Sequence, residues 1–393
     1  MKPKYFGYRS KALKTAMNIQ NPKVAAESAE YTNEGDASRV ALQKMIKDSF
    51  GTIVGAMGDL LRRMEEASGI EKHKSRHQAI DTVQKQIVGL NLNVLFGLSN
   101  IDEKEKSSIG RAIIDAGREF ARRMVNPLRV LYNIPKDIKF FIDVGKLVIL
   151  GRRLAKILDT VKIDDPSANL SGVNWVHAWV GKVGRVGKLG KVIGLLMAST
   201  QTVPLTAVWM LHLVGSDEDV RKQLRSELKA LGVCSGADLT TQKIEQMKVA
   251  EAVVLETLRL YPPFPLIQRQ AQADDVLVDT VVPAQTLVYV VPWLVHRNPK
   301  YWKAPHSFHP SRFLEGSAQH GDAPSDWVYI PFGRGSRMCA GYRLAIIELK
   351  VLLALAVLEY RWESIFSPGS RADSIYPDLG MFPTGLDFLV ERI

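Results

Sequence analysis

Near its end the chain reads Phe332-Gly-Arg-Gly-Ser-Arg-Met-Cys-Ala-Gly341, directly before an apolar run over 344–358. The spacing of that run predicts a helix, so Cys339 stands just ahead of a helix N-terminus. Free backbone N–H groups, the helix dipole and neighbouring arginines all favour a thiolate there by lowering the thiol pKa. Gly335 and Gly341 have no side chain, so a large planar partner can lie close to the backbone. The stretch therefore predicts a thiolate facing a flat ligand.

Five positions of this stretch match the haem-ligand signature F-x-x-G-x-R-x-C-x-G, and through them the chain resembles the cytochrome P450 family. The resemblance continues over 345–348. It implies that Cys339 is the iron ligand of haem b and that its thiolate pushes electron density toward dioxygen. The other cofactor-binding residues that it implies here are Phe332, Gly333, Arg337, Gly341 and Ala345. A lone cysteine in a loop is the alternative, which five matches in one frame disfavour.

A second region supports the same resemblance. Glu256 and Arg259 stand three apart in a helical run that ends at Tyr-Pro-Pro, and Phe308-His-Pro-Ser-Arg-Phe313 lies downstream. The latter is similar to the family motif F-x-P-E-R-F, with Ser311 in place of the acid. The resemblance implies a network of Glu256, Arg259 and Arg312 that locks the core and takes no part in chemistry. A solvated surface ion pair is the alternative.

Between these motifs, short β-branched runs over 276–278 and 287–291 predict a β region. Here the resemblance suggests Arg269, His296 and Arg337 as partners of the haem propionates, because cationic and N–H donors suit carboxylates. For Arg269 and His296 the alternatives, a surface arginine and a core histidine, stay open.

The apolar run over 191–214 predicts a long helix, and it contains Ala198-Ser-Thr-Gln-Thr202 where the family has A-G-x-D/E-T. The resemblance implies that Ala198 lies against the haem and that Thr202, with Gln201, handles proton relay. Gln201 cannot titrate, so the relay is weakened or rerouted. Pro204 kinks the helix, and the stretch is similar to the sterol and prostacyclin branch, which contains hydroxylases and a peroxide isomerase. The alternative is that these polar side chains only bond back within a kinked helix.

The fold predicted from helical spacing and resemblance is mainly α with a small β region, a cytochrome P450-like triangular fold lacking part of its N-terminal strands and helices. We expect one domain over 1–393: an atypical segment over 1–34, a helical part over 35–265, and the β region, ligand loop and last helix over 266–393. Four helices are expected at 51–66, 80–98, 107–125 and 137–161, and a flexible basic linker at 181–190. Arg39 and Gln43 stand where the family has W-x-x-x-R, so this propionate clamp is altered.

Composition and net charge limit the kinds of molecule that the protein is expected to bind. The 393 residues carry a formal charge of +11 and two cysteines, Cys234 and Cys339, which form no disulfide framework. Lysines and arginines are dispersed without a nucleic-acid motif, so we expect no nucleic acid; an acidic electron donor or peripheral contact with an anionic membrane explains the charge. No signal peptide or membrane anchor is recognised, and only the resemblance suggests the cytosolic face of the endoplasmic reticulum.

The resulting hypothesis is a haem-thiolate monooxygenase of lipid or secondary metabolism that oxidises a lipophilic small molecule with dioxygen. Its electrons would come from NADPH through a reductase such as NADPH-cytochrome reductase, because no flavin or nicotinamide module is recognised here. One alternative is a redox-neutral isomerase or dehydratase acting on a peroxide. Another is a truncated, inactive haem-binding protein.

Overall fold

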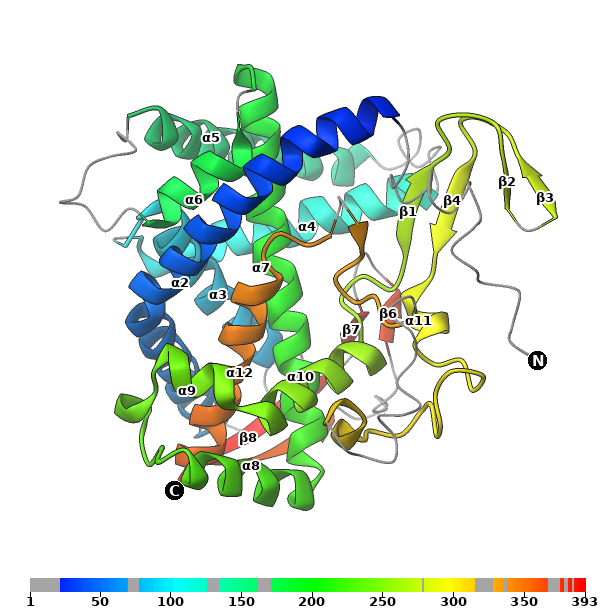
Figure 1. The fold of residues 1–393 in the computed structure, drawn as a ribbon. Helices are drawn as coiled ribbons and strands as arrows, with labels where there is room; N and C mark the ends of the chain where they lie inside the picture. The colour runs from blue at the N-terminus through cyan, green and yellow to red at the C-terminus, as the bar shows by residue number, and fades with distance from the viewer. Residues whose placement is uncertain are drawn as a thin grey trace.

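The computed structural model describes residues 22–69, 78–99, 101–125, 134–160, 171–181, 183–277, 279–314, 328–335, 338–366, 375–377, 381–383 and 385–393. Most of these residues are helical (Figure 1). The α-helices are α2 (Pro22–Gly69), α3 (Gln78–Phe96), α4 (Glu103–Val125), α5 (Ile134–Thr160), α6 (Ser171–Val180), α7 (Arg185–Gly215), α8 (Glu218–Ala230), α9 (Thr241–Gln246), α10 (Lys248–Leu260), α11 (Pro292–Val295) and α12 (Tyr342–Glu359). Short 3-10 turns are η3 (Gly236–Asp238) and η4 (Pro310–Phe313).

The strands form small antiparallel pairs, β1 with β4, β2 with β3, β5 with β8 and β6 with β7. Their bounds are β1 (Ile267–Gln270), β2 (Asp275–Leu277), β3 (Thr280–Val282), β4 (Leu287–Val290), β5 (Tyr360–Phe366), β6 (Ile375–Pro377), β7 (Met381–Pro383) and β8 (Leu386–Arg392). The prediction of a mainly α fold with a small β region is confirmed.

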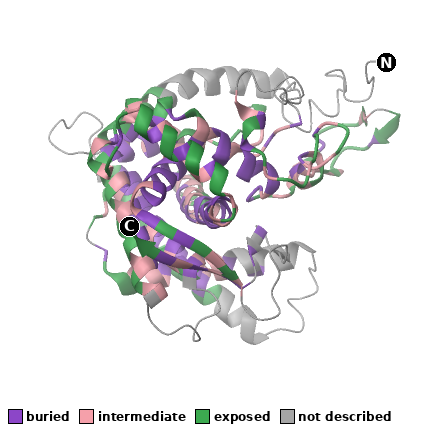
Figure 2. Ribbon diagram, turned by 90° about the horizontal axis from the view of Figure 1, so that it is seen from below, coloured by how far each residue is buried: buried purple, intermediate pink, exposed green. Residues whose placement is uncertain are grey.

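Helix α7 runs through the middle of the molecule and packs against α3, α5, α10 and α12 (Figure 1). It is apolar on most sides, and a helix of that kind is stable in water only when other elements cover it. Among the described residues it is the one helix long and apolar enough to cross a bilayer by length and composition, but 61% of its most apolar 18-residue window is buried inside the protein. Figure 2 shows the same distribution, with buried residues gathered at the centre and exposed ones on the outer helices.

The start of α7 corrects one prediction. The glycine-rich stretch over 181–190 was expected to be a linker, yet the helix already begins at Arg185. Close packing on α5 explains the difference: a Cβ added at Gly151 would lie 2.9 Å from the Leu189 side chain and 2.7 Å from that of Ile193. The N-terminal turns of α7 therefore gain tertiary contacts, which outweigh the low helix propensity of glycine.

Helix α12 is buried along most of its length and packs against α2, α7 and α10. It also buries a carboxyl group, Glu348, which is 1% exposed. Its Oε1 has no hydrogen-bond partner among the described residues. Burial raises the pKa of Glu348 to about 8, because the apolar surroundings disfavour the carboxylate. The carboxyl is thus protonated in the folded protein at neutral pH.

Replacing Glu348 by glutamine should stabilise the protein, and more so as pH rises. The folded state keeps the proton up to about pH 8, whereas an unfolded glutamate loses it near its ordinary pKa of about 4.3. Stability of the wild type therefore falls as pH rises through this window, by roughly 3 to 5 kcal/mol, and Glu348→Gln removes that loss. Urea midpoints at pH 5 and pH 8 measure the effect. Glu363→Gln, at an exposed position of β5, is the control; an equal gap between Glu348→Gln and wild type at both pH values contradicts the prediction.

Candidate active site

The Cys339 loop is closed by backbone hydrogen bonds and by glycines with positive φ. The Cys339 N–H donates to the Phe332 carbonyl at 2.9 Å, and the Met338 N–H donates to the Gly335 carbonyl at 3.1 Å. Gly333 and Gly335 have φ angles of 67° and 74°, a region that side chains with a Cβ rarely enter. This conformation places Cys339 just ahead of the first turn of α12, which begins at Tyr342.

Cys339 is exposed, as the site of a ligand requires. The protein around the sulfur nevertheless raises the pKa of the Cys339 thiol through desolvation, and the backbone N–H of Gly341 opposes this only in part. The expectation that the loop by itself lowers this pKa is therefore wrong, because desolvation outweighs the N–H groups of the helix start. A metal ion bound to the sulfur would reverse this shift, since a metal ion deprotonates a coordinating thiol outright.

The neighbours of Cys339 are partly buried. The ring of Phe332 lies 6.1 Å from that of Tyr342, between centroids, and Ala345 donates its N–H to the Gly341 carbonyl at 3.0 Å. A Cβ added at Gly341 would meet no atom within 4 Å, so open space adjoins this residue. Arg337 lies outside the described residues. From the expected clamp, Gln43 is exposed on α2, and the side chain of Arg39 is not among those described.

On α7, Ala198 is exposed although the helix is central. The Thr202 hydroxyl donates to the Ala198 carbonyl at 3.1 Å, one turn earlier. The Gln201 Nε2 donates to the carbonyl of Ile113 on α4 at 3.2 Å. The amide nitrogen of Gln201 thus bonds to a neighbouring helix, whereas the hydroxyl of Thr202 bonds within α7.

Sequence reasoning missed one residue of this region. Asn91 on α3 is buried, and its Nδ2 donates to the Ser199 carbonyl of α7 at 2.8 Å. No local pattern identifies it, because an asparagine within an apolar helix bears no mark of its tertiary partner.

His296, which directly follows the short helix α11, is fully buried. Its Nε2 accepts the N–H of Ile330 at 3.0 Å, so the proton of the neutral ring sits on Nδ1. That Nδ1 has no hydrogen-bond partner among the described residues. Burial lowers the pKa of His296 to about 3, which keeps the ring neutral. Arg269, on β1, is half-buried and donates from Nη1 to the Gln268 carbonyl at 2.8 Å.

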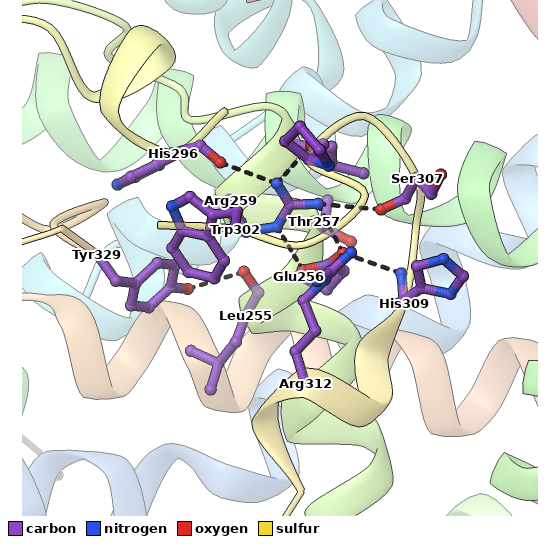
Figure 3. A network of polar contacts seen from close by, with 12 residues as sticks. Leu255, Glu256, Thr257, Arg259, His296, Trp302, Ser307, His309, Arg312 and Tyr329 are labelled. Atoms are coloured by element: carbon purple, nitrogen blue, oxygen red, sulfur yellow. Dashed lines mark hydrogen bonds and ion pairs between the residues drawn. The ribbon is translucent and has the colours of Figure 1, made fainter. Parts of the chain in front are cut away.

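The structure brings Glu256, Arg259 and Arg312 together in the interior (Figure 3). Glu256 accepts the Nε and Nη2 of Arg259 at 2.7 and 2.8 Å, the Nε of Arg312 at 3.2 Å and the N–H of His309 at 2.9 Å. The guanidinium carbon of Arg259 also lies 5.1 Å from the centre of the Trp302 ring. The cluster ties α10 to η4 and to the loop before it.

Haem is the group that this donor set fits. Cys339 offers a single exposed sulfur at a helix start, and open space adjoins Gly341. Among the described residues the buried Nδ1–H of His296 has no hydrogen-bond acceptor, and a carboxylate such as a propionate would satisfy it. The exposed Ala198 contributes only a methyl group on α7. These features suit a flat, apolar ring with an iron ligand on one side and carboxylates at its edge.

Comparison with known proteins agrees with this geometry. The family model Cytochrome P450 matches residues 188–384. "Probable cytochrome P450 4d20" of Drosophila melanogaster is 34% identical over 151 residues, 38% of this chain and 29% of the relative. "Tabersonine 16-hydroxylase 1" of Catharanthus roseus is 30% identical over 174 residues, 44% of this chain and 34% of the relative. The matched part of the chain thus spans about a third of the length of these curated relatives.

The solved structures extend the similarity to nearly the whole chain. The "Retinoic acid bound cyanobacterial CYP120A1" has a TM-score of 0.72 at 17% identity, and the match covers 97% of this chain and 81% of that one. The similarity shows a common fold, which confirms the predicted P450-like architecture. With the family model matching from α7 to the end of β7, the chain belongs to the cytochrome P450 family.

Proposed function

We propose that this protein is a haem-thiolate monooxygenase that inserts one oxygen atom into a lipophilic small molecule. The observation that carries the proposal is the exposed Cys339 at the start of α12, in a loop that only glycine-specific φ angles allow. The reaction consumes substrate, dioxygen, NADPH and a proton, and yields the hydroxylated product, water and NADP⁺. We further propose that the two electrons arrive through a separate reductase and that residues 1–393 act as one domain.

Each side chain then has a defined task. Cys339 binds the iron of haem b, and the His296 Nδ1–H holds a propionate, with Arg269 and Arg337 as further propionate partners. Thiolate-ligated haem, when bound, supplies the activation of dioxygen. Ala198 leaves room for the ring, and Thr202 moves a proton at its Oγ1. Gln201 cannot titrate, and its amide nitrogen already bonds to α4, so in this proposal it supports Thr202 without passing a proton.

The names of the similar proteins support a lipophilic substrate and a hydroxylation. The relative from Catharanthus roseus is named a hydroxylase, and the cyanobacterial structure is described as binding retinoic acid. The net charge of +11 suits an acidic reductase or an anionic membrane surface, including the cytosolic face of the endoplasmic reticulum.

The absence of a titrating side chain at position 201 favours a second candidate, the redox-neutral isomerase or dehydratase that acts on a peroxide. That chemistry needs no delivery of protons to dioxygen, so a glutamine at this position should not slow the reaction. The two candidates share the haem and Cys339 and differ in their need for electrons.

Turnover with and without reductants separates them. Purified holoprotein should bind lipophilic ligands from a panel of sterols, fatty acids and terpenoids with a type I spectral shift. The bound ligand should then be hydroxylated only when NADPH, reductase and dioxygen are all present. Conversion of a hydroperoxide without any of these would overturn the monooxygenase in favour of the isomerase. Protein that binds haem but converts neither would be the inactive form.

A further inference from the structure

The turn of α7 that carries Ala198 and Thr202 has weakened backbone hydrogen bonding. Pro204 lies inside the helix and lacks the N–H that would otherwise bond to the Thr200 carbonyl. The hydroxyls of Thr200 and Thr202 donate back to the carbonyls of Leu196 and Ala198, at 2.7 and 3.1 Å. Such back-bonding slightly destabilises and bends a helix. The turn therefore needs a restraint from outside to keep one conformation.

Asn91 supplies that restraint. It is 1% exposed on α3, and its Nδ2 donates to the Ser199 carbonyl at 2.8 Å. Ser199 follows Ala198, whose carbonyl receives the Thr202 hydroxyl. A partly buried hydrogen bond from a second helix to this peptide fixes the carbonyl next to the one that Thr202 uses. Removal of the donor takes away the bond that ties this carbonyl to α3, and the loss of such a bond weakens the restraint on the turn.

We propose that Asn91 is a positioning residue that holds the Ser199 peptide so that the Thr202 hydroxyl keeps its place on α7. The effect of Asn91 on turnover rests on the proposed monooxygenase function. The restraint itself is a property of the fold and can be measured on the protein without any turnover. Gln201, which bonds to α4 on the same stretch, is a second tether and does not replace Asn91, because the two amides contact different helices.

The matched pair of variants is Asn91→Leu and Gln84→Leu. Gln84 lies two turns earlier on the same helix, is 3% exposed, and its Nε2 has no hydrogen-bond partner among the described residues. Both changes bury a leucine in α3, but only the first removes a bond to α7. Amide hydrogen exchange in residues 196–206 should be roughly 5- to 100-fold faster in Asn91→Leu and unchanged in Gln84→Leu. Equal exchange in Asn91→Leu and wild type, or equal acceleration in both variants, overturns the proposal.

Asn91→Asp separates the hydrogen bond from side-chain volume. A protonated carboxyl can donate to the Ser199 carbonyl, whereas a carboxylate cannot, and burial raises the pKa of such a group. We expect protection near that of the wild type at pH 5 and its loss by pH 9, with wild type measured at the same pH values. Protection of Asn91→Asp that follows wild type across this range shows that donation is not what matters, and the proposal falls.

Turnover tests the link to Thr202. At unchanged haem content, Asn91→Leu should divert a several-fold larger share of NADPH electrons to hydrogen peroxide, whereas Gln84→Leu should not. Unchanged product per NADPH in Asn91→Leu overturns the positioning role even if exchange is faster. Wild-type protein that makes no NADPH-dependent product overturns the proposed function and this catalytic consequence, while hydrogen exchange still decides the restraint on α7.

Discussion

Replacing Cys339 by histidine should abolish the Soret band characteristic of thiolate-ligated haem in reduced protein treated with carbon monoxide. Imidazole is a neutral ligand and does not push electron density onto the iron as a thiolate does. Loss of a metal's hydrogen-bonding support alone commonly costs 10- to 100-fold in activity, so loss of the ligand should lower product formation by more than about 100-fold. Absorption spectra of the purified variant and product formation measure the two effects.

Cys234→Ser is the matched control. Cys234 is the other cysteine of the chain, exposed in the loop before η3, where its N–H donates to the Asp238 carboxylate. Serine there should leave the thiolate-type band intact. A wild-type spectrum typical of histidine ligation, or retention of the thiolate-type band in Cys339→His, would show that Cys339 is not the ligand.

Local pattern was enough to predict the helices that became α3, α4, α5, α7 and α12 and the β region that became β1 to β4, whereas the strands β5 to β8 were not predicted. The apolar runs that became α7 and α12 are long and bounded by glycines or polar residues, and such runs specify a buried helix from composition alone. The paired runs around 276–290 likewise became strands, because β-branched residues and turn residues alternate there.

Properties that depend on the surroundings of a residue could not be predicted from its neighbours in sequence. The arginines and helix start near Cys339 indicated a low thiol pKa, but desolvation by packed chain raises it. Gln201 stands where an acid would titrate, yet the Ile113 carbonyl that it bonds comes from a helix 88 residues earlier. Glu348 ends the stretch over 345–348 that resembles the family sequence. Nothing in that stretch shows that Glu348 is buried and that its Oε1 has no partner among the described residues. Tertiary packing decides all three.

Replacing Glu256 by glutamine should strongly destabilise the fold. Glu256 and Arg259 have no exposed side-chain surface, and Arg312 has 4%. Loss of the carboxylate leaves two buried guanidinium groups without a counter-charge, which costs about 3 to 5 kcal/mol. Proteins are stable by only about 5 to 15 kcal/mol, so this is a large share of the total. The urea midpoint of unfolding at pH 7 measures the change.

An exposed cluster of the same composition gives the control. Glu218, at the start of α8, pairs with Arg221 at 2.6 Å and with Arg225 at 3.2 Å. Its arrangement of one carboxylate with an arginine three residues on and a second arginine resembles that of Glu256, but water screens the exposed charges. Glu218→Gln should leave the urea midpoint nearly unchanged. Equal shifts for Glu218→Gln and Glu256→Gln would show that burial of the network is not what stabilises it.

A double variant tests whether the unpaired charge is the cause. If the cost of Glu256→Gln comes from a stranded guanidinium, then removing Arg312 in the same chain should recover part of it. Glu256→Gln with Arg312→Leu should therefore unfold at a higher urea concentration than the sum of the single changes predicts. Arg312 also donates from Nη2 to the Ala304 carbonyl at 2.9 Å, so recovery stays incomplete. Strict additivity would mean that Glu256 stabilises the fold through its hydrogen bonds to Arg259 and the His309 N–H, with no share from its charge on Arg312.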